Sequence, residues 1–355
     1  MTSTSVPSTP SRRSLLGLLA LAPLGVAGLS ACAQGEDASG AAPAEPAASG
    51  SGTSAAAART LTLDFATYNP LSLVVRDQGW LEAELGGQGV TVEWVQSAGS
   101  NKANEFPRNG NIQIGSTAGA AALLARSNGS PIKTIDVFSQ PNWSGVVVGP
   151  SSTITDVAGL RGKRVAATTG TDPYFFLVQS LEQAGLTTSD ITLENLQHAD
   201  GRSALDAGNV DAWAGLDPIM AAAEAEGGDK IIYQNIDFNS YGFLNAREDF
   251  LAESPDLAQA VVDAYERARA WVPQNVEATT ALLAEVAGIA PEVATTTLSR
   301  TKLDISPVPG ATQTAVLQKI GPLFVANGDV PDQGAVDTAL SSLFDTTYAS
   351  QADPS

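Results

Sequence analysis

An alternation of strand-like and helix-like segments over residues 60–240 constrains the fold of this chain more than any other feature. Short apolar runs with a period of two predict strands, and longer stretches with a helical period predict helices. In the first series the expected strands are 61–66, 90–96, 112–115, 132–139 and 145–148, and the expected helices are 70–85, 102–108 and 119–127. This order predicts an α/β fold with a mainly parallel sheet covered by helices.

A second series of the same kind follows, and then a helical tail. The expected strands are 163–167, 191–196, 211–214 and 230–233, with helices at 154–160, 173–184, 203–207 and 218–226. After a strand at 241–245 only helices are expected, at 255–272, 276–286, 291–300, 312–326 and 333–348. We therefore expect two lobes, with lobe 2 (149–240) inserted in lobe 1 (60–148 and 241–355), crossovers near 148–151 and 238–241, and a ligand cleft between them.

Composition excludes several kinds of site. Of 355 residues, 43% are hydrophobic and 16% charged, so the body from about Thr60 can bury two cores. The formal net charge of −19 argues against a nucleic-acid partner, because phosphate contacts need clustered Lys and Arg. A single cysteine, Cys32, and a single histidine, His198, leave no Cys or His cluster for a transition metal. We expect no metal and no cofactor.

The N-terminal residues resemble a bacterial lipoprotein signal. Arg12 and Arg13 precede an apolar stretch that ends in Leu29-Ser30-Ala31-Cys32. The alternative is a transmembrane helix followed by a buried cysteine, but the stretch has only about 15 residues and a span needs about 20. The resemblance implies a signal peptide (1–31), a lipid on Cys32 and anchoring on the outer face of the cytoplasmic membrane. Export would use the twin-arginine route or the general secretory route. Residues 32–59, rich in Ala, Gly, Ser and Pro, would form a disordered tether.

Three segments of small residues stand between a predicted strand and a predicted helix, at 97–101, 115–119 and 168–172. A helix N-terminus presents free N–H groups and partial positive charge, so small residues there can admit an anion. Parallel α/β sheets place such loops at one edge, where ligands bind. The alternative is ordinary N-capping by Ser, Thr, Asn and Asp. No nucleotide-binding glycine motif occurs.

Several other polar and aromatic residues have two possible roles. The aromatic residues expected in loops would either hold a ligand group or pack in a core; they are Tyr68, Trp143, Tyr174, Trp213 and Tyr241. His198 lies too close in the sequence to Asp200 and Ser203 for a triad, whose members usually come from different elements, and is expected as a cleft or domain-contact residue. Asp217 would cap the helix after Pro218, or would meet a cationic ligand group or a partner across the lobes.

Short motifs in order along nearly the whole body carry a family resemblance. They are 66–72 (ATYNPLS), 78–81 (QGWL), 92–95 (VEWV), 99–102 (GSNK), 115–119 (GSTAG), 160–166 (LRGKRVA), 170–173 (GTDP), 210–214 (VDAWA) and 217–218 (DP). Together they resemble the solute-binding lipoproteins of ABC importers, in the aliphatic-sulfonate, taurine and nitrate group. The resemblance implies a periplasmic-binding-protein fold of the second type, which closes on its ligand.

Thirteen residues are candidates for binding the ligand. Twelve of them lie in the positions that match the family's ligand loops, and Trp143 is added from the aromatic residues named above. They are Tyr68, Asn69, Ser100, Asn101, Ser116, Thr117, Trp143, Gly170, Thr171, Asp172, Tyr174, Trp213 and Asp217. Thr117 and Thr171 would hold a sulfonate, while Trp143, Tyr174 and Trp213 would contact its tail. The expected partners are a small anion, most simply an organosulfonate, and the permease and ATPase of an importer, with the protein itself a monomer.

Three alternatives to an organosulfonate carrier stay open. The same machinery could carry nitrate, bicarbonate or a thiamine-precursor-like amine, and a cationic ligand would need Asp217 free. A lipid-anchored sensor without a permease is the second alternative. The third is an enzyme on this fold, related to pyrimidine-precursor synthases, although those need cysteine- and histidine-rich segments that this body lacks.

Overall fold

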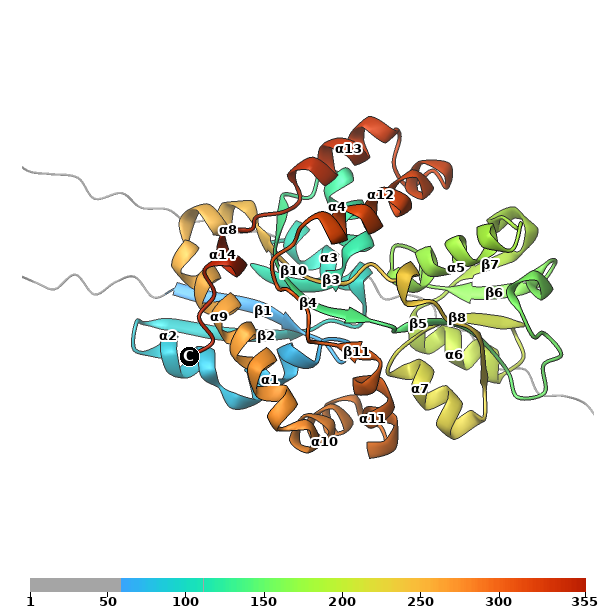
Figure 1. Ribbon diagram of the computed structural model, residues 1–355, viewed down its shortest axis with the longest axis horizontal. Coiled ribbons are helices and arrows are strands. Elements are labelled where there is room, and N and C mark those ends of the chain that lie inside the picture. The colour runs from blue at the N-terminus through green and yellow to red at the C-terminus, as the bar shows by residue number, and fades with distance from the viewer. Residues whose placement is uncertain (1–58, 111) are drawn as a thin grey trace, which may run out of the picture. The chain divides into compact units, whose positions relative to one another are not determined.

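Two β-sheets organise the computed structural model, which describes residues 59–110 and 112–355 (Figure 1). The large sheet has the order β11-β4-β10-β3-β1-β2. Its strands are β1 (Arg59–Phe65), β2 (Val90–Gln96), β3 (Ile114–Ala118), β4 (Ile132–Pro141), β10 (Gly242–Arg247) and β11 (Thr301–Lys302). The small sheet has the order β7-β6-β8-β5-β9. Its strands are β5 (Ser144–Val148), β6 (Arg164–Ala167), β7 (Thr192–Asn195), β8 (Ala212–Leu216) and β9 (Lys230–Tyr233). The predicted α/β class is confirmed.

Helices follow most strands and cover the sheets. Around the large sheet are α1 (Pro70–Gln78), α2 (Trp80–Gly86), α3 (Ser100–Arg108), α4 (Gly119–Ser127), α8 (Glu248–Glu253) and α9 (Pro255–Trp271). The small sheet carries α5 (Asp172–Gln183), α6 (His198–Asp206) and α7 (Ile219–Ala222). The tail adds α10 (Val276–Ala287), α11 (Pro291–Ser299), α12 (Ala311–Ala326), α13 (Gln333–Ser342) and α14 (Thr347–Ser350).

The expectation of a mainly parallel sheet is wrong for both sheets, which are mixed. β1 pairs in parallel with β2 and β3, but β10 is antiparallel to β3 and β4. In the small sheet β6 is parallel to β7 and β8, whereas β5 is antiparallel to β8 and β9. The antiparallel strands include those beside the two crossovers. At these places the chain enters one sheet directly from the other sheet, and not through a βα connection, which is the connection that parallel strands need.

The first crossover also differs from the expected position. β4 pairs in the large sheet, and β5 pairs in the small sheet, so the chain crosses at 142–143 and not near 148–151. The return at 239–241, between the turn Ile236–Phe238 and β10, matches the expected place. Both sheets belong to one compact unit, residues 55–355. The division of this unit into two lobes with the predicted bounds stays a prediction.

Local backbone chemistry explains the other differences. The single helix expected over 70–85 is two helices, because Gly79 takes a left-handed conformation with φ of 62°. Strand β3 extends to Ala118, so Ser116 and Thr117 lie in a strand and not in a loop. Helix α6 begins at His198, five residues before the expected start. The helix expected over 333–348 is divided between α13 and α14.

The N-terminal predictions lie almost wholly outside the described residues. This holds for the signal peptide, Cys32 and residues 32–58 of the tether. Arg59, expected at the end of the tether, is instead the first residue of β1 and pairs with Asp256 at 2.9 Å.

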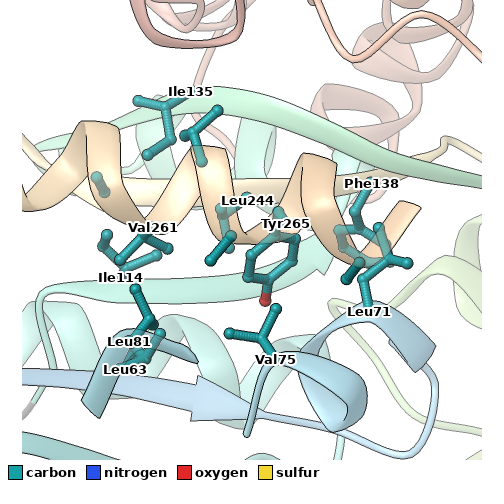
Figure 2. Close-up of a cluster of buried hydrophobic side chains, with 14 of the residues drawn as sticks. Leu63, Leu71, Val75, Leu81, Ile114, Ile135, Phe138, Leu244, Val261 and Tyr265 are labelled. Carbon is teal, nitrogen blue, oxygen red and sulfur yellow. The ribbon is translucent and has the colours of Figure 1, made fainter. Parts of the chain in front are cut away.

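Buried apolar side chains hold helices on both faces of the large sheet. Helix α9 lies across one face with α1 and α2, and Figure 2 shows Val261 and Tyr265 of α9 between Leu63 of β1 and Leu244 of β10. On the other side, Phe243 packs with residues of α4, α12 and α13 in a second cluster that continues to Phe175 of α5. Burying apolar surface in this way contributes roughly 25 cal/mol per Å². The helical tail therefore completes the core of the large sheet.

Candidate functional site

A cavity of about 520 Å³ lies where loops of the two sheets meet. We call it the cleft cavity. The large-sheet side contributes the ends of β1 and β2 and the start of α3; the small-sheet side contributes the starts of α6 and α7; the end of α10 closes it. The lining residues are Thr67, Gln96, Ser97, Ala98, Lys102, Gln197, His198, Ala199, Arg202, Pro218, Ile219, Ala222, Val286, Ala287 and Ile289.

One part of the cleft cavity suits an anion. The N-termini of α3 and α6 both reach it, and their N-cap residues Gly99 and Gln197 make no side-chain cap. Such ends carry unsatisfied N–H groups and partial positive charge. Lys102 and Arg202 add two cations, which pair with Glu105 at 3.0 Å and Glu226 at 2.8 Å. These surface pairs are weak enough to be exchanged for a ligand anion.

Five other residues that line the cleft cavity are apolar. Ile219 and Ala222 of α7 face it from the small-sheet side, and Val286, Ala287 and Ile289 face it from the end of α10. We call these five residues the apolar wall. A ligand with a charged group and a hydrocarbon tail could satisfy both parts of the cavity, because apolar surface gains free energy when it leaves water.

Like Ser97, His198 is a buried polar residue of this cavity, with 2% of its surface exposed. Its Nδ1 lies 3.2 Å from the Thr168 hydroxyl, and its Nε2 has no hydrogen-bond partner within the described part of the chain. Burial lowers the pKa of His198 to about 4. The imidazole is therefore neutral at pH 7, which leaves one ring nitrogen as an acceptor.

None of the thirteen candidate residues lines the cleft cavity. In the 115–119 segment the polar groups have partners inside the large sheet. Ser116 donates to Asp64 at 3.0 Å, and Thr117 donates to the Ala118 carbonyl at 3.0 Å and accepts from Asn245 at 2.8 Å. The Ser100 hydroxyl accepts from the Ala118 N–H at 2.9 Å.

The first amides of α4 are also occupied. The Gly119 N–H donates to the Tyr241 carbonyl and the Ala120 N–H to the Ser240 hydroxyl, both from the second crossover. This segment therefore joins the large sheet to the crossover. It does not present an open ring of donors, in contrast to the expectation for the 115–119 loop.

Asp64 makes these contacts possible from the C-terminal end of β1. It is fully buried and accepts hydrogen bonds from Ser97 at 2.7 Å and from the Ser116 N–H at 2.8 Å. Burial raises the pKa of Asp64 to about 7, although these hydrogen bonds oppose the shift. The carboxyl group links the ends of β1, β2 and β3, which keeps the edge of the large sheet in one arrangement.

The 168–172 segment is tied to both crossovers. Gly170 has φ of 75°, and the Thr171 hydroxyl donates to the Thr168 carbonyl at 2.6 Å. Asp172, whose pKa burial raises to about 6, accepts from the Trp143 indole at 2.8 Å and from the Ser240 N–H at 2.9 Å. Trp143 belongs to the first crossover and Ser240 to the second, so one carboxylate connects them.

Tyr68 extends the same cluster to the large sheet. Its ring meets Trp143 edge to face at 5.9 Å, and its hydroxyl donates to the Ser116 carbonyl at 3.0 Å. Asn69 behaves as a structural residue: it caps α1 by accepting from the Ser72 N–H, and it donates to the Tyr265 hydroxyl at 3.1 Å.

Two of the candidate aromatic residues pack in cores. Trp213 is fully buried in β8 with residues of α6 and α7, and a Cβ at Gly201 would lie only 2.7 Å from its ring. Tyr174 lies in α5, with its ring 5.2 Å from that of Phe175. Trp213 lies within a strand and Tyr174 within a helix. This agrees with the strand expected over 211–214 and the helix expected over 173–184, and not with the loop positions expected for these two aromatic side chains.

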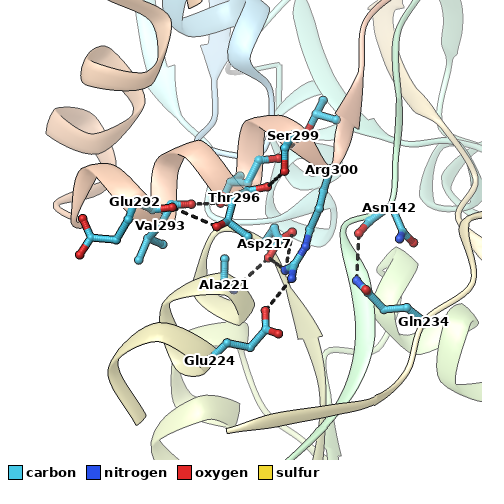
Figure 3. A network of polar contacts seen from close by, with 12 residues as sticks. Asn142, Asp217, Ala221, Glu224, Gln234, Glu292, Val293, Thr296, Ser299 and Arg300 are labelled. Carbon is cyan, nitrogen blue, oxygen red and sulfur yellow. Dashed lines mark hydrogen bonds and ion pairs between the residues drawn. The ribbon is translucent and has the colours of Figure 1, made fainter. Parts of the chain in front are cut away.

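Asp217 fulfils the two structural roles considered for it. Its carboxylate accepts from the Ala221 N–H at 2.9 Å, as an N-cap would, and pairs with Arg300 at 3.3 Å (Figure 3). Arg300 follows α11 and also pairs with Glu224 at 2.6 Å. Burial raises the pKa of Asp217 to about 7 against the attraction of Arg300. The arginine joins the helical tail to the end of the small sheet.

Asn101 contacts a residue that lines the cavity. Its amide donates to Gln197 at 3.4 Å, so α3 of the large sheet touches the start of α6. Sequence reasoning missed Lys102, Arg202, Arg300 and the apolar wall. Lys102 follows the 97–101 loop directly and could have been included with it, whereas no local pattern connects α10 or Arg300 with the ends of the strands.

The fold agrees with comparisons to known proteins. Residues 72–278 match the model of a family described as NMT1/THI5 like. The chain belongs to the NMT1/THI5-like family. This NMT1/THI5-like protein is 32% identical over 243 residues to a protein of Escherichia coli (strain K12) named as aliphatic sulfonates-binding, covering 68% of this chain and 76% of the relative. It is also 24% identical over 180 residues, 48% of this chain and 54% of the relative, to a taurine-binding periplasmic protein of the same organism.

Solved structures show the same architecture. The periplasmic aliphatic sulphonate binding protein SsuA from Escherichia coli matches with a TM-score of 0.70 and 26% identity, over 81% of this chain and 93% of that one. The alkanesulfonate-binding protein SsuA from Xanthomonas axonopodis pv. citri, bound to MOPS, matches with a TM-score of 0.71 and 24% identity, over 79% and 97%. The NMT1/THI5-like chain is therefore homologous to the solute-binding proteins of importers. The fold also carries catalysis, because the desulfurization enzyme DszB matches with a TM-score of 0.59 and 17% identity, over 82% of this chain and 98% of that one.

Across 59–110 and 112–355, no group of three or more His, Cys, Asp or Glu side chains is placed to hold a metal ion. Within the same residues no single helix is long and apolar enough to cross a membrane. Helices α10 and α11 together have the length and composition of a membrane span, but a bend of 115° separates them.

Proposed function

We propose that this protein captures an aliphatic sulfonate in the cleft cavity and delivers it to the permease and ATPase of an ABC importer. The sulfonate would lie beside Lys102 and Arg202 at the N-termini of α3 and α6, and the hydrocarbon chain would lie on the apolar wall. The observation that carries this proposal is the union of an anion-binding end and an apolar end in one cavity. Homology to aliphatic-sulfonate-binding proteins supports it.

The thirteen candidate residues act around the ligand in this proposal. Asn101 and Ser100 hold the start of α3, while Trp143 and Asp172 hold the two crossovers, so that the cavity walls keep their positions. Direct contact of Thr117 and Thr171 with the sulfonate stays a prediction. It would require their present hydrogen bonds to be exchanged.

The apolar wall favours an organic sulfonate over nitrate or bicarbonate, which have no hydrocarbon part to bury. A cationic ligand such as a thiamine-precursor-like amine would need a free Asp217, but Arg300 already pairs with that carboxylate. We infer binding without catalysis, because residues 33–355 contain no cysteine and one histidine.

A thermal-shift screen of the purified protein tests the ligand class. Ethanesulfonate, propanesulfonate, taurine, sulfate and nitrate would each be added at increasing concentration, because a ligand that binds only the folded state raises the Tm by mass action. We expect shifts with the organosulfonates and none with sulfate or nitrate. A shift with nitrate alone would keep the carrier role and overturn the substrate class.

We further propose that the protein is exported as a lipoprotein, through the twin-arginine route, and acts as a monomer. The arginine pair and Cys32 support this by their order in the sequence. Cells expressing the full chain should yield membrane-bound protein whose N-terminal peptide begins at a lipid-modified Cys32 in mass spectrometry. A soluble Cys32→Ser variant is the control, and soluble wild-type protein would contradict the anchor.

A further inference from the structure

Tyr241, in the second crossover, has a backbone conformation that a bulky residue rarely takes. Its φ is 67°, and across 59–110 and 112–355 every other positive φ belongs to a glycine. In this left-handed region the Cβ of an L-residue lies too close to the carbonyl oxygen that follows it. Such a conformation persists where the surrounding structure imposes it, and it is frequent in segments that switch between two arrangements.

Contacts from both sheets impose this conformation. On the large-sheet side, the Gly119 N–H donates to the Tyr241 carbonyl at 3.0 Å. The next amide of α4, that of Ala120, donates to the Ser240 hydroxyl at 2.8 Å. On the small-sheet side, Asp172 of α5 accepts from the Ser240 N–H at 2.9 Å and from the Ser240 hydroxyl. The crossover is therefore bound to a helix of each sheet immediately before Tyr241.

Close packing leaves this part of the crossover little room to shift. A Cβ at Gly119 would overlap the Ser240 carbonyl oxygen, and a Cβ at Gly242 would overlap the ring of Phe138. Gly242 is also paired with both β3 and β4. The Tyr241 side chain itself is buried in the second apolar cluster. A small local movement therefore cannot relax Tyr241, and relief of its strain requires the two sheets to move relative to each other.

We propose that Tyr241 is a strained hinge residue, which is left-handed while the cavity walls touch through Asn101 and Gln197 and returns to a negative φ when the two sheets rotate apart. The rotation would break the hydrogen bonds from α4 to the crossover, which frees the Tyr241 backbone to relax. The strain raises the free energy of the closed arrangement, and a ligand that bridges the cavity has to offset it. This inference goes beyond sulfonate binding, because it concerns the protein without ligand and does not depend on which ligand the cavity takes.

Distances between two spin labels test the inference on the full chain. Cys32→Ser removes the one cysteine of the sequence. Labels can then be attached at Asn109→Cys, after α3, and Ser203→Cys, in α6, because both positions are exposed. Double electron–electron resonance without ligand measures the ratio of the shorter, closed distance to the longer, open distance across the cavity. We expect both distances in the labelled protein with Tyr241.

Tyr241→Gly and Tyr241→Ala form a matched pair in this labelled protein. Both lose the phenol ring, but only glycine takes the left-handed conformation without strain. We expect the closed-to-open ratio to be about tenfold higher with glycine than with alanine, because the clash of the Cβ is absent. Tyr241→Phe keeps both the ring and the strain, so its ratio should equal that of the unchanged tyrosine. Urea unfolding shows whether each variant folds.

Gly119→Ala is a second test that keeps the ring of Tyr241. Its Cβ would push Ser240 away from α4, so Tyr241 should relax and the closed-to-open ratio should fall. Equal ratios in the glycine and alanine variants at 241 would overturn the inference, and so would one unchanging distance in every protein of the series. If the ring proves necessary for folding, an unchanged ratio in Gly119→Ala overturns it. A failure of all sulfonates in the thermal-shift screen would contradict the proposed function alone, since no ligand is used here.

Discussion

At the scale of single residues, buried ionisable groups at the ends of the strands make the stability of the protein depend on pH. His198 has a folded-state pKa of about 4, below the 6.5 of an unperturbed histidine. The folded state therefore excludes a proton that the unfolded chain takes up, and stability is lost as the pH falls from 6.5 toward 4. The carboxyls of Asp64, Asp172 and Asp217 act in the opposite sense, because their pKa values are raised.

Replacing the histidine isolates its share of this dependence. We expect the stability of the wild type relative to His198→Gln to fall by roughly 3 kcal/mol between pH 7 and pH 4, since one pKa unit corresponds to about 1.4 kcal/mol. Urea unfolding at several pH values measures this difference, and the three carboxyls cancel because both proteins contain them. A difference that is independent of pH would show that the histidine is not buried in its neutral form.

At the scale of elements, the ion pairs of Arg300 connect the helical tail to the small sheet. Figure 3 shows the guanidinium reaching from the end of α11 to Asp217 and Glu224. Arg300 and Asp217 are largely buried, so removing the cation would leave a carboxylate without compensation in a site of low polarity. The contact is local in space but joins residues 83 positions apart.

A mutant cycle tests the connection. Arg300→Met should lower the free energy of unfolding by about 3 kcal/mol, and Arg300→Met with Asp217→Asn should recover part of the loss because the buried charge is gone. Asp217→Asn alone completes the cycle. The matched control is Arg161→Met at the exposed pair with Asp190, where solvent screening makes the expected loss much smaller. Chemical unfolding gives all four values, and equal losses at the two arginines would contradict a buried pair.

At the scale of the whole molecule, the described part of the chain passes between the two sheets at 142–143 and again at 239–241 before the tail. Asp172 binds both passages through Trp143 and Ser240. The contact of Asn101 with Gln197 lies at the cavity, away from these crossovers along the chain. We expect ligand binding to strengthen contacts across the cavity while the crossovers act as hinges, as in other two-lobed binding proteins.

Small-angle X-ray scattering tests this expectation. The radius of gyration of the purified protein should decrease when a bound sulfonate saturates it, and should not change with the same concentration of sulfate, because only a ligand with different affinity for two conformations shifts their populations. A radius that is the same with and without bound sulfonate would mean that the cavity accepts its ligand without closure.

Much of the fold follows from local patterns. Strands β2 and β9 and helix α4 have the expected bounds, because alternation and helical period both report which face of an element is buried. The wrong predictions of strand bounds share a cause. Ser116 and Thr117 were expected in a loop but lie in β3, and β8 runs two residues beyond its expected end, since β3 and β8 are extended by pairing with β10 and β5, which are distant in the sequence.

The candidate site, like the fold, could be predicted from the sequence only in part. Its loops could be predicted, because the ends of strands and the starts of helices have characteristic residues, and the family resemblance added the sulfonate class. The cavity lining could not, because it combines the starts of α6 and α7 with the end of α10, and the ion pair of Arg300 joins parts of the chain that no periodicity relates.

The sequence by itself determined the α/β class and the order of the elements, because burial patterns are properties of neighbouring residues, and its short motifs indicated the family. Only the tertiary structure decided which residues meet. Hydrogen bonds to the backbone and to Asp64 occupy the hydroxyls of Ser116 and Thr117, whereas Nε2 of His198 has no hydrogen-bond partner within the described part of the chain. Whether a polar atom is satisfied depends on partners brought together by folding, and no local pattern in the chain records them.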